Sequence, residues 1–346
     1  MTIIQDPAIP KGSTVLVTGV NGYIGSHVAD QFLQLGFRVR GTVRDTKRGA
    51  WVAELFDKAY GAGQFELIAV PDITSEGAFL SAVKGVSAVI HVASNVTLDP
   101  DPAKVFPTAV DGALSALKAA NSERTVKRFV LTSSSFAASM SNTEKEEVVT
   151  KDSWNEKSSR TLEVDPPYPP EQGIQVYAAS KVLSEKAVWN FCNEDGTKRP
   201  DLVVNAVLPS ANFGKILDVA HQGSASTASF IEDLWNGTNV ERIAHIPPHY
   251  FIDVQDAARL HVAAALHPSV AGERVFGHAE PYNYDAILNI LRKQNPGKSF
   301  VANFQSERDL TVVEPRARAE QLLQELGRPG FTSLEESVRA TCEGLH

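Results

Sequence analysis

The sequence predicts an α/β protein built on a doubly wound parallel sheet, with a smaller lobe toward the C-terminus. Through the first half of the 346-residue chain, short runs rich in β-branched residues alternate with segments of helical periodicity. A glycine-rich turn links the first run to the first helical segment. Beyond residue 209 the pattern is less regular, and we expect this part to form a lobe over the open end of the sheet.

Six segments are predicted to be strands of this sheet. Strands that alternate with helices form βαβ units, and their parallel sheet is covered on both faces. The strands are expected at residues 13–19, 37–43, 65–70, 87–93, 127–134 and 202–209. Helices are expected at residues 110–123, 173–195, 225–237 and 254–267. Residues 136–172 are polar and then proline-rich, which predicts a long loop.

The glycine-rich turn "TGVNGYIG" follows the first strand and opens the first helix. Glycine lets the backbone approach a ligand closely, and a helix N-terminus offers free N–H groups to a pyrophosphate. In this strand-turn-helix context the glycine spacing indicates a dinucleotide-binding, Rossmann-type domain. The turn residues expected to contact the cofactor are Gly19, Asn21, Gly22, Tyr23, Ile24 and Gly25.

Basic residues at the end of the second strand favour NADPH over NADH. Binders of the non-phosphorylated dinucleotide usually carry an acidic residue here, whereas this stretch reads "VRGTVRDTKR". We expect Arg44 and Lys47 to bind the 2′-phosphate, since a guanidinium pairs with phosphate in bidentate fashion. Asp45 leaves the alternative that the ribose hydroxyls are bound instead.

Composition excludes several classes of function. A net charge of −8 argues against nucleic-acid binding. The only cysteines, Cys192 and Cys342, are too few for a disulfide framework or a Cys-rich metal site. His245 and His249 are four residues apart, but two prolines between them exclude the helix of a zinc-protease site, so we expect no metal. No apolar run reaches signal-peptide or membrane-span length, and we expect a cytoplasmic protein without a membrane partner.

The segment "VYAASK" places Tyr177 and Lys181 on one face of a helix, about one turn apart. That spacing alone is common on helix surfaces. It gains weight from the serine cluster "TSSS" at the end of the fifth strand, because carboxyl ends of parallel strands form the ligand-binding edge of such sheets.

Together, "TGVNGYIG", "TSSS", "YAASK", "NAVLP", "HVAS" and the late "HYFIDVQDAARLHVAA" resemble the extended short-chain dehydrogenases/reductases over nearly the whole chain. Within that superfamily the sequence is most similar to fungal NADPH-dependent aldehyde and carbonyl reductases of the methylglyoxal type, and to plant dihydroflavonol reductases. The resemblance implies hydride transfer from NADPH to an aldehyde or ketone. It also implies that residues 1–200 form the NADP-binding domain, and that 201–346 are mainly a substrate-binding lobe, with strand 202–209 returning to the sheet.

The resemblance further implies roles for individual residues. Tyr177 would protonate the carbonyl oxygen, and Lys181 would lower the pKa of Tyr177 and bind the nicotinamide ribose. Ser134 would orient the carbonyl, with Ser133 as the alternative. Further cofactor contacts are expected from Asp72, Ile73, Ala93, Ser94 and Pro209.

Loops at the carboxyl ends of the strands should shape the substrate pocket. The apolar candidates are Val96, Phe136, Phe213, Phe230 and Trp235, together with Tyr168. This set suggests an apolar or aryl carbonyl substrate, such as an aldehyde, ketone or keto ester.

Two other functions stay open. The same fold serves sugar epimerases and hydroxysteroid-type dehydrogenases with tightly held NAD, and non-enzymatic regulators that sense NADP. A hydrolase is disfavoured because the chain has no G-x-S-x-G elbow. The oligomeric state is open between monomer and homodimer.

Overall fold

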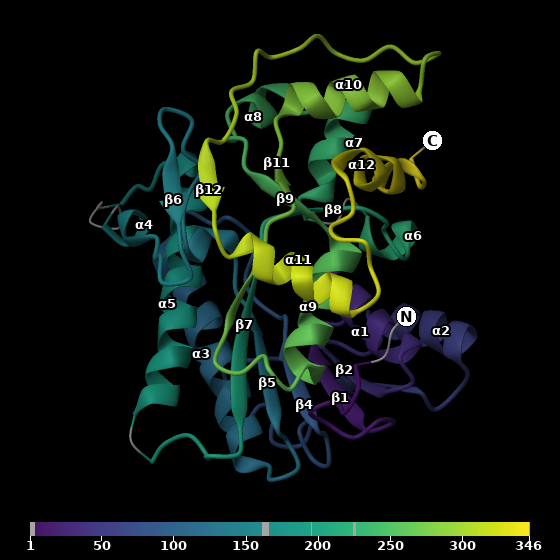
Figure 1. Ribbon diagram of the computed structural model, residues 1–346, viewed down its shortest axis with the longest axis vertical. Helices are drawn as coiled ribbons and strands as arrows, with labels where there is room; N and C mark the ends of the chain where they lie inside the picture. The colour runs from purple at the N-terminus through teal and green to yellow at the C-terminus, as the bar shows by residue number, and fades with distance from the viewer. Residues whose placement is uncertain (1–3, 161–165, 195, 224–225, 346) are drawn as a thin grey trace.

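A computed structural model describes residues 4–160, 166–194, 196–223 and 226–345. A twisted sheet lies between two layers of helices, and a smaller lobe lies beyond the carboxyl ends of its strands (Figure 1). The sheet strands are β1 (Thr14–Thr18), β2 (Arg38–Val43), β3 (Phe65–Ala69), β4 (Ala88–His91), β5 (Arg128–Thr132), β7 (Val203–Pro209) and β10 (Arg274–Gly277).

The sheet has the order β10-β7-β5-β4-β1-β2-β3, and every pair in it is parallel. The predicted α/β fold and all six predicted strands are confirmed. The chain reverses its direction of winding between β1 and β4, so the crevice at their carboxyl ends is the expected ligand site.

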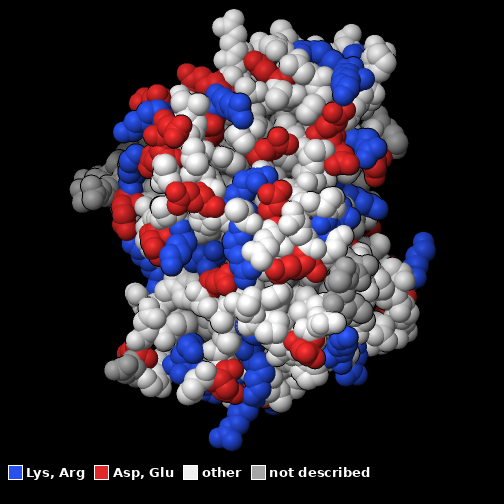
Figure 2. Space-filling model, in the orientation of Figure 1, with Lys and Arg blue, Asp and Glu red and all other residues white. Residues whose placement is uncertain are grey.

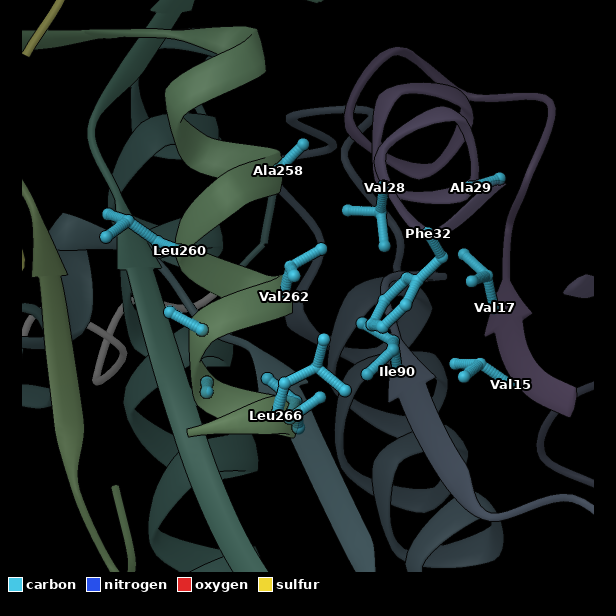
Figure 3. Close-up of a cluster of buried hydrophobic side chains, with 14 of the residues drawn as sticks. Val15, Val17, Val28, Ala29, Phe32, Ile90, Ala258, Leu260, Val262 and Leu266 are labelled. Carbon is cyan, nitrogen blue, oxygen red and sulfur yellow. The ribbon is translucent and has the colours of Figure 1, made fainter. Parts of the chain in front are cut away.

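Helices cover both faces of the sheet. One face carries α1 (Tyr23–Gln34), α2 (Ala50–Tyr60), α9 (Val254–Leu266) and α11 (Arg316–Glu325), and the other carries α3 (Pro102–Ser122) and α5 (Gly173–Asn193). In Figure 3, Phe32 of α1 lies between the strand residues Val17 and Ile90, and α9 brings Val262 and Leu266 to the same cluster. Burial of these side chains fixes α1, and with it the glycine turn, against the sheet.

The C-terminal lobe has its own core around Phe213, Phe251, Tyr282 and Leu288. A three-stranded sheet in it has the order β11-β9-β8. Its elements are β8 (Ala211–Phe213), α6 (Val219–Gln222), α7 (Ala228–Asn236), α8 (Val240–Ala244), β9 (Tyr250–Asp253), β11 (Glu280–Pro281), α10 (Tyr284–Gln294) and α12 (Leu334–Cys342).

The structure differs from the sequence-based expectation in two places. Besides β7, helix α9 and strand β10 also return from the C-terminal part to the main sheet. The predicted loop 136–172 contains η1 (Ser135–Ala137), β6 (Glu147–Val149), α4 (Glu156–Arg160) and η2 (Pro170–Gln172), and β6 pairs in parallel with β12 (Thr311–Val313). Residues 161–165 of that loop, and residues 195 and 225 of two predicted helices, lie outside the described residues.

Acidic and basic side chains are intermixed on the face shown in Figure 2. Among the described residues, no helix combines the length and apolar character needed to cross a membrane.

Candidate active site

The glycine turn after β1 is closed by contacts that only glycine permits. Gly19 has a positive φ of 64°, and a Cβ there would lie 3.0 Å from Cα of Ala93, at the end of β4. A Cβ on Gly25 would lie 2.3 Å from the carbonyl oxygen of Gly19. Gly22 is the N-cap of α1 and has no side chain to satisfy the first N–H groups of the helix. The turn therefore presents bare backbone at a helix N-terminus, which suits a pyrophosphate.

A segment that follows β8 lies against this turn. The Tyr23 hydroxyl donates a hydrogen bond to the Gly214 carbonyl oxygen at 2.7 Å. Gln222 of α6 donates through Nε2 to Ser26 Oγ at 3.0 Å and to the Asn21 carbonyl oxygen at 3.4 Å. Sequence reasoning missed Gln222, because about 200 residues separate it from the turn and no local pattern marks the contact.

The basic residues near the end of β2 have different environments. Arg40 donates to Glu66 Oε2 at 2.9 Å and to two carbonyl oxygens, so it stabilises the sheet edge. Arg44 and Lys47 are exposed, and their side chains have no hydrogen-bond or ion-pair partner within the described part of the chain. Asp45 accepts the backbone N–H of Lys47 at 2.9 Å and so orders this turn. The cationic groups of Arg44 and Lys47 are thus free at the strand end.

Two other predicted cofactor contacts, Asp72 and Ala93, lie at the neighbouring strand ends. Asp72 accepts bonds from Thr74 and Ser75, which hold the pKa of its carboxyl below the usual value. The Thr18 hydroxyl accepts the N–H groups of Val92 and Ala93 at 2.9 and 3.0 Å, which joins β1 to the segment after β4.

The remaining predicted contacts are less exposed. Ile73 and Ser94 are partly buried, and Ile73 packs beside Gly112 of α3. Pro209 is buried at the end of β7, opposite Gly277 of β10.

Helix α5 brings Tyr177 and Lys181 to the end of β5. The Lys181 ammonium lies 3.5 Å from the Thr132 carbonyl oxygen and 5.7 Å from the centre of the Tyr177 ring. Ser134 follows β5, and its hydroxyl lies close enough to Tyr177 to lower the tyrosine's pKa. The structure thus brings together the three residues that the sequence proposed as catalytic.

The neighbouring serine has another partner. Ser133 Oγ donates to Glu185 Oε2 at 2.6 Å, inside a buried ion pair between Glu185 and Arg274. Of the two serines left open by the sequence, the geometry therefore favours Ser134 for contact with the reacting group.

Burial acts in opposite directions on the two ionisable groups of this site, because it disfavours the charged form of each. It raises the pKa of Tyr177, and the Ser134 hydroxyl only partly offsets this. Burial lowers the pKa of Lys181 to about 8, and the negative charge of Glu185 opposes that shift. The expected net lowering of the Tyr177 pKa is therefore not seen in the protein alone, since desolvation is the larger effect.

The predicted substrate residues are dispersed. Phe136 packs edge-on against Tyr177, with ring centroids 6.2 Å apart. Val96, in the segment after β4, is 57% exposed. Tyr168 is partly buried in the segment that leads into α5.

Three aromatic candidates belong to the lobe instead. Phe213 is fully buried between Phe251 and Tyr282, so the expectation that it lines a pocket is wrong. Phe230 packs against Tyr284, and Trp235 packs against Phe300. These contacts supply aromatic core to the lobe, and neither of them, among the ring contacts of the described residues, involves Tyr177.

A histidine-carboxylate pair lies behind Phe136. The ring centroids of His249 and Phe136 lie 5.2 Å apart. Nδ1 of His249 lies 2.8 Å from Oδ2 of the buried Asp309. From the sequence, His249 could be considered only as a metal ligand, and the two prolines before it excluded that role. Sixty residues separate His249 from Asp309, and no sequence motif marks the pair. No group of metal-ligating side chains occurs in the residues that the structure describes.

Comparison with known proteins places this arrangement in a family. Residues 15–277 match the model of the NAD dependent epimerase/dehydratase family. The chain is 37% identical over 341 residues to aldehyde reductase 2 of Sporidiobolus salmonicolor, with 98% of each chain covered. It is 39% identical over 346 residues to the ketoreductase adrE of Penicillium roqueforti, again with 98% of each covered.

A solved structure agrees with these sequence matches. The crystal structure of Gre2 from Candida albicans in complex with NADPH superposes with a TM-score of 0.78 at 25% identity, covering 96% of this chain and 98% of that one. The chain belongs to the NAD dependent epimerase/dehydratase family, within the extended short-chain dehydrogenases/reductases that its motifs resemble.

Proposed function

We propose that this protein uses NADPH to reduce aldehydes and ketones to alcohols, with Tyr177 as the proton donor. The observation that carries the proposal is the meeting of Tyr177, Ser134 and Lys181 at the carboxyl end of β5. This group lies on the same edge of the sheet as the glycine turn after β1. Relatives that match over 98% of the chain carry the names aldehyde reductase and ketoreductase, which supports the same chemistry.

The residues around the turn fit a phosphorylated dinucleotide. A Cβ at Gly19 or Gly25 would collide with the backbone of Ala93 or of Gly19, so glycine at both positions lets the turn stay tight and present bare backbone at the helix N-terminus. Arg44 and Lys47 are exposed cations beside it, suited to a 2′-phosphate. When bound, the reduced nicotinamide would supply the hydride.

The chain's own residues would handle the proton and the position of the carbonyl. Burial keeps the Tyr177 phenol protonated, so its hydroxyl is ready to donate to the carbonyl oxygen as negative charge develops there. The Ser134 hydroxyl would hold that oxygen in place. The Lys181 ammonium would stabilise the phenolate that remains.

The substrate side of this site is apolar near the reacting group. Phe136 packs on the Tyr177 ring, and Val96 is exposed in the segment after β4. We propose that these two side chains contact the substituents of an apolar or aryl carbonyl compound.

The direct test is oxidation of NADPH and of NADH with a panel of aldehydes, aryl ketones and keto esters. We expect rapid loss of NADPH absorbance with several apolar members and slower loss of NADH. Loss of neither cofactor, together with oxidised NAD that copurifies with the protein, would instead support an epimerase or a dehydrogenase with tightly held NAD.

Replacing Arg44 with alanine is expected to raise KM for NADPH about tenfold or more and to change KM for NADH little. The reason is that a charge-assisted contact to phosphate contributes about 1.5–3 kcal/mol. Arg38→Ala is the matched control, because this exposed arginine lies at the opposite end of the same strand. Equal effects of Arg44→Ala on both cofactors would contradict the role in 2′-phosphate binding.

A further inference from the structure

Three consecutive residues at the end of β5 meet three positions of α5 that are one helical turn apart. The Thr132 carbonyl oxygen lies 3.5 Å from Lys181 Nζ, and Ser133 Oγ lies 2.6 Å from Glu185 Oε2. The Ser134 hydroxyl lies near that of Tyr177 and lowers the pKa of the tyrosine. The contact between Ser133 and Glu185, called the middle contact below, involves neither the proposed proton donor nor a proposed ligand of the substrate. It ties the strand to α5 one helical turn beyond Lys181, beside the other two contacts.

Glu185 is unusually well bound for a buried carboxylate. Its side chain is fully buried and accepts from Ser133, from Trp189 Nε1 at 3.1 Å and from Arg274 Nε at 2.6 Å. Charged side chains are rarely buried without such partners.

Arg274 connects this carboxylate to two other elements. It comes from β10 and also donates to the carbonyl oxygens of Lys151 and Ser153, at 3.0 and 2.7 Å. Its guanidinium lies 4.0 Å from the centre of the Trp154 ring. The pair thus joins α5, β5, β10 and the segment after β6 at one buried point.

We propose that Glu185, held by Arg274, is a positioning residue for the reduction: it keeps Ser134 in register with Tyr177 and supplies the negative charge that retains the Lys181 ammonium. This inference rests on the proposed reductase function. It assigns a chemical role to a buried ion pair that does not touch the reacting atoms.

The charged and titratable groups around Lys181 are few. On its own helix they are Tyr177 and Glu185, and β4 contributes His91, whose pKa burial lowers to about 3, so that it is neutral at working pH. Beyond Glu185, β10 contributes Arg274.

The other elements that pack on α5 keep their charges at the surface. The charged residues of α3 (Lys104, Asp111 and Lys118) are exposed. On α4, Glu156 pairs with Lys186 on the outside of α5. Glu185 is therefore the carboxylate that opposes the desolvation of Lys181, in agreement with the direction of its effect on the lysine pKa.

The test is the pH dependence of kcat/KM for NADPH-dependent reduction. Activity should fall as the Lys181 ammonium is lost, which gives an alkaline limb. Glu185→Gln should move that limb down by about one pH unit, because it removes a nearby negative charge. Arg274→Gln should move it up, because it leaves the carboxylate unneutralised. A structural role alone would not produce opposite shifts.

Three further variants separate register from charge. Glu185→Asp keeps the charge but shortens the side chain, and Ser133→Ala removes the middle contact; both should lower kcat severalfold with the limb within about 0.3 pH unit of the wild type. Glu156→Gln, an exposed carboxylate on neighbouring α4, is the control and should leave rate and limb unchanged. NADPH binding and thermal unfolding, measured on each variant, establish that the site is folded.

If the wild-type protein reduces carbonyls but the alkaline limb is unshifted in both Glu185→Gln and Arg274→Gln, the inference is overturned and the proposed function stands. If one of these two does not fold, the other still gives a signed shift. A wild type that is inactive toward every carbonyl would instead contradict the proposed function itself.

Discussion

Tyr177→Phe is expected to lower kcat/KM for carbonyl reduction by about a thousandfold while the affinity for NADPH changes less than about threefold. Proton donation by a positioned side chain contributes roughly 10²–10⁴ in rate, and phenylalanine removes only the donor. The aromatic ring and its edge-on packing against Phe136 are retained in the variant. The measurement is steady-state reduction of an aryl ketone beside a fluorescence titration with NADPH.

The control for this variant is Tyr60→Phe. Tyr60 bonds Asp30 on the outer side of α1 and α2, so loss of its hydroxyl should leave the rate unchanged. Turnover of Tyr177→Phe within tenfold of the wild type would rule out Tyr177 as the proton donor. A loss of NADPH binding equal to the loss of rate would point to a collapsed site instead.

Acidification is expected to destabilise the protein steeply between pH 7 and pH 5, by roughly 7 kcal/mol of unfolding free energy. Four histidines are buried as neutral rings, and desolvation is the first cause that lowers the pKa of each. The values fall to about 4 for His27 and His261 and to about 3 for His91 and His278.

The sign follows from the direction of these shifts. Each pKa is lower in the folded than in the unfolded chain, where it is about 6.5, so the unfolded state binds more protons below that pH. Stability is therefore present above pH 6.5 and is lost progressively as pH falls toward 4. Geometry agrees for His261. Its Nδ1 faces the Ala257 carbonyl oxygen at 2.7 Å, so in the neutral ring Nε2 accepts from Thr132 Oγ1, and protonation of Nε2 would force that hydroxyl to change from donor to acceptor.

Urea unfolding at pH 7, 6 and 5 measures this loss. His278→Phe should reduce the slope by about a quarter, since one of four titrating groups is removed while the contacts with Tyr250 and Phe276 can be kept. The exposed His245, replaced by glutamine, should leave the slope unchanged. A free energy that stays constant from pH 7 to pH 5 would mean that these rings are not buried and neutral.

The longer strands could be predicted from the sequence because they are buried on both faces and are therefore rich in β-branched residues. Strand β10 was not predicted, because it has only four residues at the sheet edge and depends on pairing with β7. β6 and β12 have three residues each and pair across more than 160 positions of the chain. No local pattern encodes such a pairing.

The site residues likewise fall into those that a local sequence pattern predicts and those that depend on tertiary packing. Gly19, Gly25, Tyr177 and Lys181 could be found because backbone and helix geometry fix their spacing in the sequence. The pocket aromatics could not, since the orientation of Phe213 depends on how irregular segments of the lobe pack. The partner of Ser133 could not be found either, because Glu185 is neutralised by a residue of β10, a strand that the sequence did not reveal.

The return of α9 and β10 to the sheet has a consequence for how the chain matures. The lobe segment between β8 and β9 is enclosed in sequence by pieces of the nucleotide-binding layer, so the two parts cannot be separated by a single cut. A fragment that ends at residue 200 lacks β7, β10 and α9, the helix that packs on α1. On the ribosome, the strands from β1 to β5 emerge first. Their sheet lacks its β7–β10 edge until residue 277 has left the exit tunnel.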